Sequence, residues 1–177
     1  MYKYVVLMAI LCLIYRRFVY IKPHAFWDRQ PVSRTTTKAL GIIGRTPKFN
    51  IVLQSGEYFS IDDLEKNFSV IADFLNENFS SNYIFPKDYL FETLCYLHNN
   101  SAINISLYNT DGILGFIHAK PVKMCIYGKE ISMYYVDFLC INKEYRGKNY
   151  ASILISKLIS YINLPYQSFI FKKDLYK

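Results

Sequence analysis

The stretch Val136-Asp137-Phe138-Leu139-Cys140-Ile141 decides the fold of this chain, because it is an apolar run of residues that favour strands. A short polar loop follows it, with Arg146 and Gly147 at the turn. From Ala151 onward the apolar residues recur at helical spacing, at Ile153, Leu154, Leu158, Ile159 and Ile162. The pattern predicts a strand, a tight loop and a helix. A helix start beside an arginine combines free backbone N–H groups, the positive end of the helix dipole and a cation, so it suits a phosphate group.

The composition of the chain is that of a folded protein with a sizeable core. It has 177 residues, which suits one domain, and 52% of them are hydrophobic, with 17 Tyr and 13 Phe, which excludes a disordered chain. Lys and Arg number 21 against 14 Asp and Glu. The formal net charge of +7 therefore fits an anionic partner, such as a nucleic acid, a membrane surface or a phosphorylated cofactor. No basic run contains interleaved aromatic residues, so we expect no nucleic acid partner.

The cysteines and histidines show neither metal-binding nor catalytic spacing. The four cysteines are Cys12, Cys95, Cys125 and Cys140. They form no CxxC motif and no Cys/His set with metal-ligand spacing, so no metal site is predicted. A reducing compartment is the simpler interpretation of these cysteines. The three histidines are far apart, and nothing local supports a catalytic Cys–His pair: His24, His98 and His118.

The N-terminal residues 1–22 form an apolar segment that we separate from a single domain over residues 23–177. The run Tyr4–Tyr15 is apolar between its flanking tyrosines, and basic residues stand on both sides of it, at Lys3, Arg16, Arg17 and Lys22. Three interpretations stay open: a membrane anchor or membrane-surface segment over residues 1–21, a buried helix or strand, and a cleaved signal, although no small-x-small cleavage site follows. The charges behind the run would leave the domain in the cytoplasm.

Two helices are predicted in the first half of the domain. Ser60-Ile61-Asp62-Asp63 resembles a capping box, and it precedes an apolar stripe that ends near Asn78, formed by Leu64, Phe68, Ile71, Leu75 and Phe79. A second helix is expected after Pro86, through Tyr89 to Leu97.

Strands follow these helices. Alternation and turn residues predict a strand over Ile103–Leu107, a turn at Asn109–Gly112 and a strand over Ile113–Ala119. Pro121 is expected to break that run. The remaining expected strands are Val122–Tyr127, Ser132–Ile141 and Ser168–Phe171.

Several segments resemble one family of acyltransferases. Arg146–Ala151 looks like the pyrophosphate loop of the GNAT acyl-CoA transferases, Arg/Gln-x-x-Gly-x-Gly/Ala, with Asn149 where a second glycine is preferred. Asp137-Phe138-Leu139-Cys140 resembles the Asn-Phe-Leu-Cys block of the glycylpeptide N-myristoyltransferases, a branch of that superfamily. Three further segments resemble that branch: Phe26-Trp27 with Gln30-Pro31-Val32, where Arg29 replaces a threonine, then Leu75–Phe79, and Gly115-Phe116-Ile117.

The resemblance implies an α+β fold, the GNAT-like acyl-CoA N-acyltransferase fold, with a mixed, mostly antiparallel sheet flanked by helices. The family has two fused GNAT-like halves, and this chain resembles the first half only, over about Phe26 to Phe171. The implied reaction transfers myristate from myristoyl-CoA to the N-terminal glycine of a peptide or protein. A second polypeptide could complete the missing half. Two other functions stay open: an inactive module that binds acyl-CoA or lipid, and an N-acetyltransferase that uses acetyl-CoA.

The resemblance also implies the site residues. The backbone N–H groups of Phe138 and Leu139 would form the oxyanion hole at a bulge in the strand, although residues 138–141 could also be plain core. Asp137 replaces the family's asparagine, and it is either a substitute base or a strand residue paired with a lysine. No acyl-cysteine at Cys140 is expected. The cofactor-binding residues would be Ala25, Phe26, Trp27, Phe138, Leu139, Cys140, Ile141, Arg146, Gly147, Lys148, Asn149, Tyr150 and Ala151.

Overall fold

The computed structural model describes residues 2–19, 51–61, 64–79, 84–96, 102–126, 128–162 and 168–171. The chain divides into two compact units, Met1–Val32 and Ser33–Lys177. In the first unit the expected apolar segment forms helix α1, Tyr2–Val19. Those of its large apolar side chains whose exposure is described are exposed: Tyr4, Val5, Val6, Leu7, Met8, Ile10, Leu11 and Leu13. Among the described helices, none has both the length and the apolar character needed to cross a bilayer.

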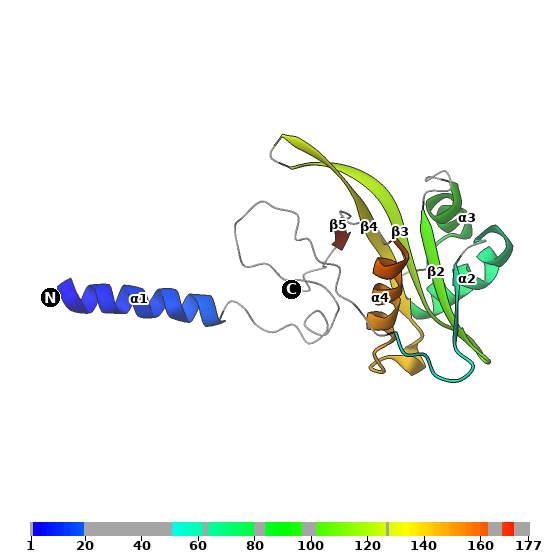
Figure 1. Ribbon diagram of the computed structural model, residues 1–177, viewed down its shortest axis with the longest axis horizontal. Helices are drawn as coiled ribbons and strands as arrows, with labels where there is room; N and C mark the ends of the chain where they lie inside the picture. The colour runs from blue at the N-terminus through cyan, green and yellow to red at the C-terminus, as the bar shows by residue number, and fades with distance from the viewer. Residues whose placement is uncertain are drawn as a thin grey trace. The chain divides into compact units, whose positions relative to one another are not determined.

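The second unit is built on a five-stranded sheet (Figure 1). Its strands follow the order of the chain: β1 Tyr58–Ile61, β2 Ile103–Asn109, β3 Gly112–Ile126, β4 Lys129–Ile141 and β5 Ser168–Phe171. Each neighbouring pair is antiparallel except β4 and β5, which are parallel. The expected mixed, mostly antiparallel sheet is therefore confirmed.

Helices cover both faces of this sheet. They are α2 Leu64–Asn78, α3 Lys87–Phe91 with a π-helical continuation over Glu92–Tyr96, and α4 Tyr150–Ile162. A methyl group of Leu154 on α4 lies against Gly115 of β3, whereas the next residue, Phe116, joins a core cluster with α2 and α3. Because successive strand residues point to opposite faces, α4 covers one face of the sheet and α2 covers the other.

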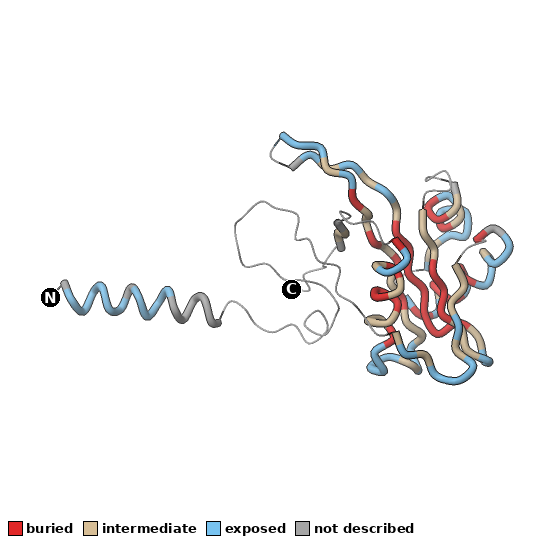
Figure 2. Tube along the Cα trace, viewed as in Figure 1, coloured by how far each residue is buried: buried red, intermediate tan, exposed pale blue. Residues whose placement is uncertain are grey.

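The core follows from these apolar faces. Figure 2 shows that buried residues run along the central strands and the inner side of α4, while exposed residues lie outside. On the α2 side, the cluster contains Leu64, Ile71, Ala72, Phe74, Leu75, Leu90, Leu94, Ile113, Phe116, Phe138 and Cys140. Of the apolar stripe predicted for this helix, Leu64, Ile71 and Leu75 lie in the cluster and Phe68 packs against it. Phe79 lies beyond the end of α2 and is exposed.

Two local predictions were wrong. Ser60 does not cap a helix, because it lies in β1 and pairs with Ser106 of β2, and α2 begins only at Leu64. Pro121 does not end its strand, because β3 runs through it to Ile126. Pairing of β3 with β2 ends at Ala119, whereas pairing with β4 continues, so a residue without an N–H is tolerated at this open edge.

Candidate functional site

The strand β4 bulges at the predicted position. Phe116 pairs with Cys140 and His118 pairs with Asp137, so Phe138 and Leu139 lie opposite a single residue of β3. The φ of Phe138 is 49°, in the left-handed region that bulky residues rarely adopt. Such strained backbone is held by its surroundings and is common at functional sites. A bulge locally disrupts the regular hydrogen-bond ladder, and an oxyanion hole would need main-chain N–H groups that the ladder does not use.

One of these two N–H groups already has an acceptor. The amide of Phe138 donates a hydrogen bond to Oδ1 of the half-buried Asp137, at 2.9 Å. A thioester oxygen that used this N–H would therefore have to replace the carboxylate. The aspartate also places a negative charge beside the point where an oxyanion would form, which opposes that charge.

The connection between β4 and α4 is exposed over residues 146–149 and leads into the start of a helix. It consists of a 3-10 turn, Lys143–Tyr145, followed by Arg146–Ala151, which we call the phosphate loop. Gly147 and Asn149 have φ of 81° and 69°, so Asn149 takes the left-handed conformation for which glycine is preferred, and asparagine tolerates it. Residues 146–149 are exposed, and no described residue accepts a hydrogen bond from the amides of Gly147 to Ala151. Free amides at a helix start bind anions.

The side chains of Lys148 and Tyr150 in this connection have defined partners. Lys148 places Nζ 4.6 Å from the ring centroid of Tyr145. Tyr150 is buried, and its hydroxyl donates a hydrogen bond to the carboxylate of Glu57, which raises the pKa of Tyr150 to about 12. The phenol is therefore protonated at neutral pH and ties the first residue of α4 to the segment before β1. Tyr150 thus offers an anion its backbone N–H rather than its side chain.

The side chain of Arg146 binds main-chain carbonyl groups at the ends of two elements, β4 and α2. Its Nε donates to the carbonyl of Ile141, at 3.3 Å, and its Nη2 donates to the carbonyl of Asn78, the last residue of α2. The side chain of Asn78 is itself buried. Its Oδ1 accepts from the amide of Lys143, at 3.0 Å, and its Nδ2 donates to the carbonyl of Phe74, at 3.0 Å.

An aromatic cluster that sequence analysis did not identify surrounds the bulge. The ring of Phe138 lies 5.7 Å from that of Phe79 and 5.6 Å from that of Phe85, between centroids. Asn76 holds Phe85 in place, because its side chain accepts from the amide and donates to the carbonyl of that residue. The resemblance of Leu75–Phe79 to the family was the one sequence feature that pointed to this cluster. The residues that Asn76 and Phe79 contact, Phe85 and Phe138, lie beyond the end of α2 and could not be inferred from it.

Cys140 lies in the core next to the bulge. Its side chain is 3% exposed, and burial raises the pKa of the thiol to about 12 against the opposing effect of the Arg146 and Lys143 charges. The thiolate is the nucleophilic form, so this cysteine is inert at neutral pH. Its neighbours Leu139 and Ile141 are half-buried.

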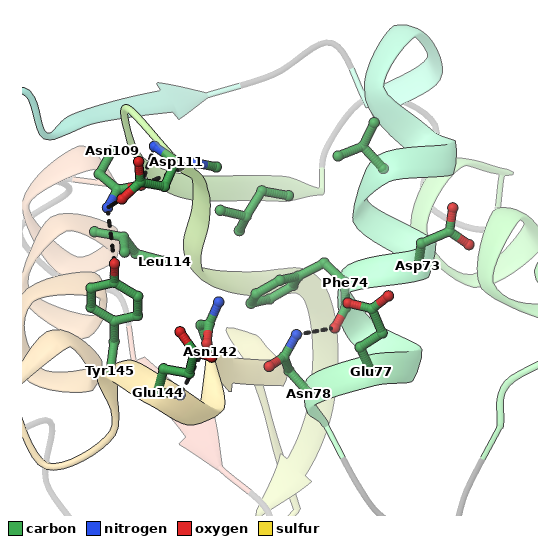
Figure 3. A pocket seen from close by; sticks show the side chains of 13 residues that line it. Asp73, Phe74, Glu77, Asn78, Asn109, Asp111, Leu114, Asn142, Glu144 and Tyr145 are labelled. Atoms are coloured by element: carbon green, nitrogen blue, oxygen red, sulfur yellow. Dashed lines mark hydrogen bonds between the residues drawn. The ribbon is translucent and has the colours of Figure 1, made fainter.

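A separate cleft of about 620 Å³ lies between α2, the β2–β3 turn and residues 142–145 (Figure 3). Four carboxylates line it, from Asp73, Glu77, Asp111 and Glu144. None of the predicted cofactor residues that the structure describes lines this cleft, and its negative charge does not suit a phosphorylated cofactor. Within the described ranges, no group of three or more His, Cys, Asp or Glu side chains could hold a metal ion.

The predicted site residues fall into three groups: the bulge, the phosphate loop and residues 25–27. The first two groups lie on one continuous segment, because β4 ends at Ile141 and leads through the 3-10 turn into the phosphate loop. Ala25, Phe26 and Trp27 lie outside the described residues.

Comparison with known families agrees with this geometry. The family model described as "Myristoyl-CoA:protein N-myristoyltransferase, N-terminal domain" matches residues 45–168. The chain belongs to this family. Relatives from several organisms are named glycylpeptide N-tetradecanoyltransferase, which is the name of an enzyme. The Plasmodium falciparum (isolate 3D7) protein is 31% identical over 122 residues, covering 63% of this chain and 30% of the relative. The Saccharomyces cerevisiae protein is 29% identical over 161 residues, covering 81% and 35%. The chain spans about a third of the length of these N-myristoyltransferases.

Solved structures share the fold. Saccharomyces cerevisiae N-myristoyltransferase with bound myristoyl-CoA aligns with a TM-score of 0.61 and 24% identity, over 80% of this chain and 38% of the yeast chain. A GNAT family acetyltransferase from Staphylococcus aureus aligns with a TM-score of 0.53 and 16% identity, over 68% and 88% of the two chains. The GNAT-like α+β fold class is therefore confirmed.

Proposed function

We propose that this chain binds myristoyl-CoA and takes part in transfer of the myristoyl group to the amine of an N-terminal glycine. The observation that supports this most strongly is one segment that combines a bulged strand with a loop whose amides have no acceptor among the described residues, in a chain of the N-myristoyltransferase family. The match covers only 30% and 35% of the relatives that share the name glycylpeptide N-tetradecanoyltransferase, so the reaction of this chain is our proposal.

In this proposal the phosphate loop holds the pyrophosphate of CoA. The amides of residues 147–151 point to the anion, and the start of α4 adds its positive dipole. Lys143 and Lys148 are exposed on the same connection and supply charge. The thioester lies along residues 138–141, and Ala25, Phe26 and Trp27 contribute further contacts to the cofactor.

The reaction needs an oxyanion hole and a proton acceptor. The glycine amine attacks the thioester carbon, and the N–H groups of Phe138 and Leu139 stabilise the oxyanion until the C–S bond breaks and the CoA thiolate leaves. The amine must first lose a proton, because an α-amino group with a pKa of about 8 is mostly an ammonium at neutral pH. We propose that a second polypeptide supplies the acceptor, as well as part of the peptide site.

Asp137 controls this step in our proposal. Its carboxylate accepts the hydrogen bond of the Phe138 N–H, which is then not available to the oxyanion. Asp137→Asn should weaken or break that hydrogen bond and raise kcat by about tenfold. This is a modest part of what one oxyanion-hole donor contributes to kcat. If Asp137 were instead the proton acceptor, the same variant would lose activity. The steady-state rate of the two proteins on myristoyl-CoA and a glycine-starting peptide, with and without lysate of the source, separates these roles.

A second candidate function is an acyl-CoA-binding module without turnover. The engaged N–H of Phe138 favours it. Calorimetric titration with CoA, acetyl-CoA and myristoyl-CoA, followed by the transfer assay, distinguishes the candidates. Tight binding of myristoyl-CoA without transfer in any mixture would favour the module, and equal binding of acetyl-CoA would favour an acetyltransferase. Failure of all three ligands to bind would refute the proposal.

We also propose that α1 associates with a membrane surface, with the domain on the cytoplasmic side. The large apolar side chains described in this helix are exposed, for example Tyr4 at 76% and Leu13 at 66%, and Arg16 and Arg17 follow the apolar run. Flotation of the full chain on anionic vesicles should be lost in the double variant Leu7→Glu, Leu11→Glu. Equal flotation of both proteins would contradict the proposal.

A further inference from the structure

We propose that Asn78 and Arg146 form a clamp that positions the phosphate loop, and that Arg146 acts through the main chain rather than as a ligand of the phosphates. This inference rests on the proposed function, since it assigns a role within the same site. It makes the end of α2, a helix on the face opposite α4, part of the machinery that shapes the anion site.

The first half of the clamp is the guanidinium of Arg146. It donates to the carbonyl of Ile141, where β4 ends, and to the carbonyl of Asn78, where α2 ends. The last carbonyls of a helix have no partner within the helix, and the negative end of its dipole attracts a cation. The last turn of α2 contains no basic residue of its own. Arg146 therefore supplies, from 68 positions away, the charge and the donor that this helix end lacks.

The second half of the clamp is the carboxamide of Asn78. This side chain is 7% exposed, and both of its polar atoms are used. Its Nδ2 closes the last turn of α2 on Phe74, and its Oδ1 receives the amide of Lys143, the first residue of the 3-10 turn. A buried carboxamide with both ends satisfied has one orientation, so it fixes the entry of the connection relative to α2.

The two halves hold the connection at both ends of its 3-10 turn. Lys143 is fixed by the side chain of Asn78, and Arg146 is fixed to the main chain of the same residue. The residues between them are also bound, because Asn142 accepts from the amides of Glu144 and Tyr145. No described residue accepts a hydrogen bond from the amides of the next residues, Gly147 to Ala151. The direction of these amides therefore depends on where the clamp places the start of the loop.

A clamp and a direct phosphate ligand respond differently to Arg146→Lys. Lysine keeps the positive charge, but its single ammonium cannot reproduce the planar fork that reaches two carbonyls at once. A charge that contacts phosphate makes binding sensitive to salt, because ions screen it. A positioning residue changes affinity without changing that sensitivity.

The experiment measures the Kd of CoA for the full chain by calorimetry at low and high salt, and amide exchange of Lys143 by NMR without ligand. The variants are Asn78→Ala, Arg146→Ala, Arg146→Lys and the double alanine variant. Asn67→Ala, an exposed asparagine of α2, and Lys129→Ala, an exposed cation of β4, are the matched controls.

We expect each of the three single clamp variants to weaken CoA binding by about tenfold, the size of one charge-assisted hydrogen bond. The double variant should be little worse than either single variant, the salt dependence should match wild type, and the Lys143 amide should exchange faster. Wild-type affinity in Arg146→Lys, with a smaller salt dependence in Arg146→Ala, would overturn the clamp. If wild type binds no CoA, the proposed function fails. In that case hydrogen exchange of the Lys143 amide alone tests the clamp. Faster exchange in both Arg146 variants supports it, and unchanged exchange overturns it.

Discussion

Replacing Gly115 by alanine should destabilise the domain by forcing α4 away from the sheet. A Cβ at this position would lie 2.7 Å from Cδ1 of Ile141, 2.8 Å from Cδ1 of Leu154 and 3.1 Å from the carbonyl oxygen of Cys140. The two methyl groups can move, but the carbonyl belongs to the paired strand and cannot. Overpacking of this kind costs up to about 3 kcal/mol, and the entropic advantage of alanine over glycine returns about 1 kcal/mol, so the expected net loss is about 2 kcal/mol.

The assay is thermal unfolding of the full chain. A loss of about 2 kcal/mol should lower Tm by about 4–8 °C in a chain of this size. Ile141→Val removes Cδ1, the atom at 2.7 Å, and alone should lower the free energy of unfolding by about 1 kcal/mol. Because the shorter side chain also relieves part of the clash with the new Cβ, the double variant should lose about 1 kcal/mol less than the sum of the two single losses. An unchanged Tm in Gly115→Ala, or strict additivity with Ile141→Val, would refute the reasoning.

Three further predictions concern Asn149, Tyr150 and Cys140. Asn149→Gly should keep the free energy of unfolding in urea, whereas Asn149→Ala should lose about 1 kcal/mol, because alanine resists the φ of 69°. Tyr150→Phe removes the donor to Glu57 and should cost about 2 kcal/mol. Because the pKa of Tyr150 is raised in the folded state, this contribution is complete below pH of about 10 and is lost as pH rises through about 12, which pH-dependent unfolding measures. Cys140 should resist a thiol reagent at mildly alkaline pH until denaturant is added, whereas the exposed Cys125 should react at once.

Local features of the fold could be predicted because neighbours in the sequence determine them. The turn between β2 and β3 is one example. Asn109 accepts hydrogen bonds from the amides of Asp111 and Gly112, and Gly112 adopts a φ of 136° that its residue type permits. The helix after Pro86 is another, since proline stands just before its first turn, where a missing N–H costs nothing.

Features that depend on distant partners could not be predicted. Strand β1 has four residues and no strong alternation of apolar and polar residues. It is a strand because its main chain pairs with β2. The tolerance of Pro121 depends on where β2 stops. Phe138 reads as ordinary core in the sequence, and only its family resemblance suggested the bulge. The carbonyl that Arg146 binds at the end of α2 has no local signal at all, so the cation was expected to face the phosphate.

The order of the strands has a consequence for how the molecule folds. β2, β3 and β4 are joined by tight connections, and their pairings bring together residues close in sequence. The two outer pairings are not local, since Tyr58 meets Tyr108 and Met133 meets Ser168. Closing long loops costs chain entropy before any contact is gained, so we expect the three-stranded meander to form first and both edges to join afterwards. Pulse-labelled hydrogen exchange during refolding should protect Phe116 before Ile170. The parallel edge would then be the last part of the sheet to order and the first to open.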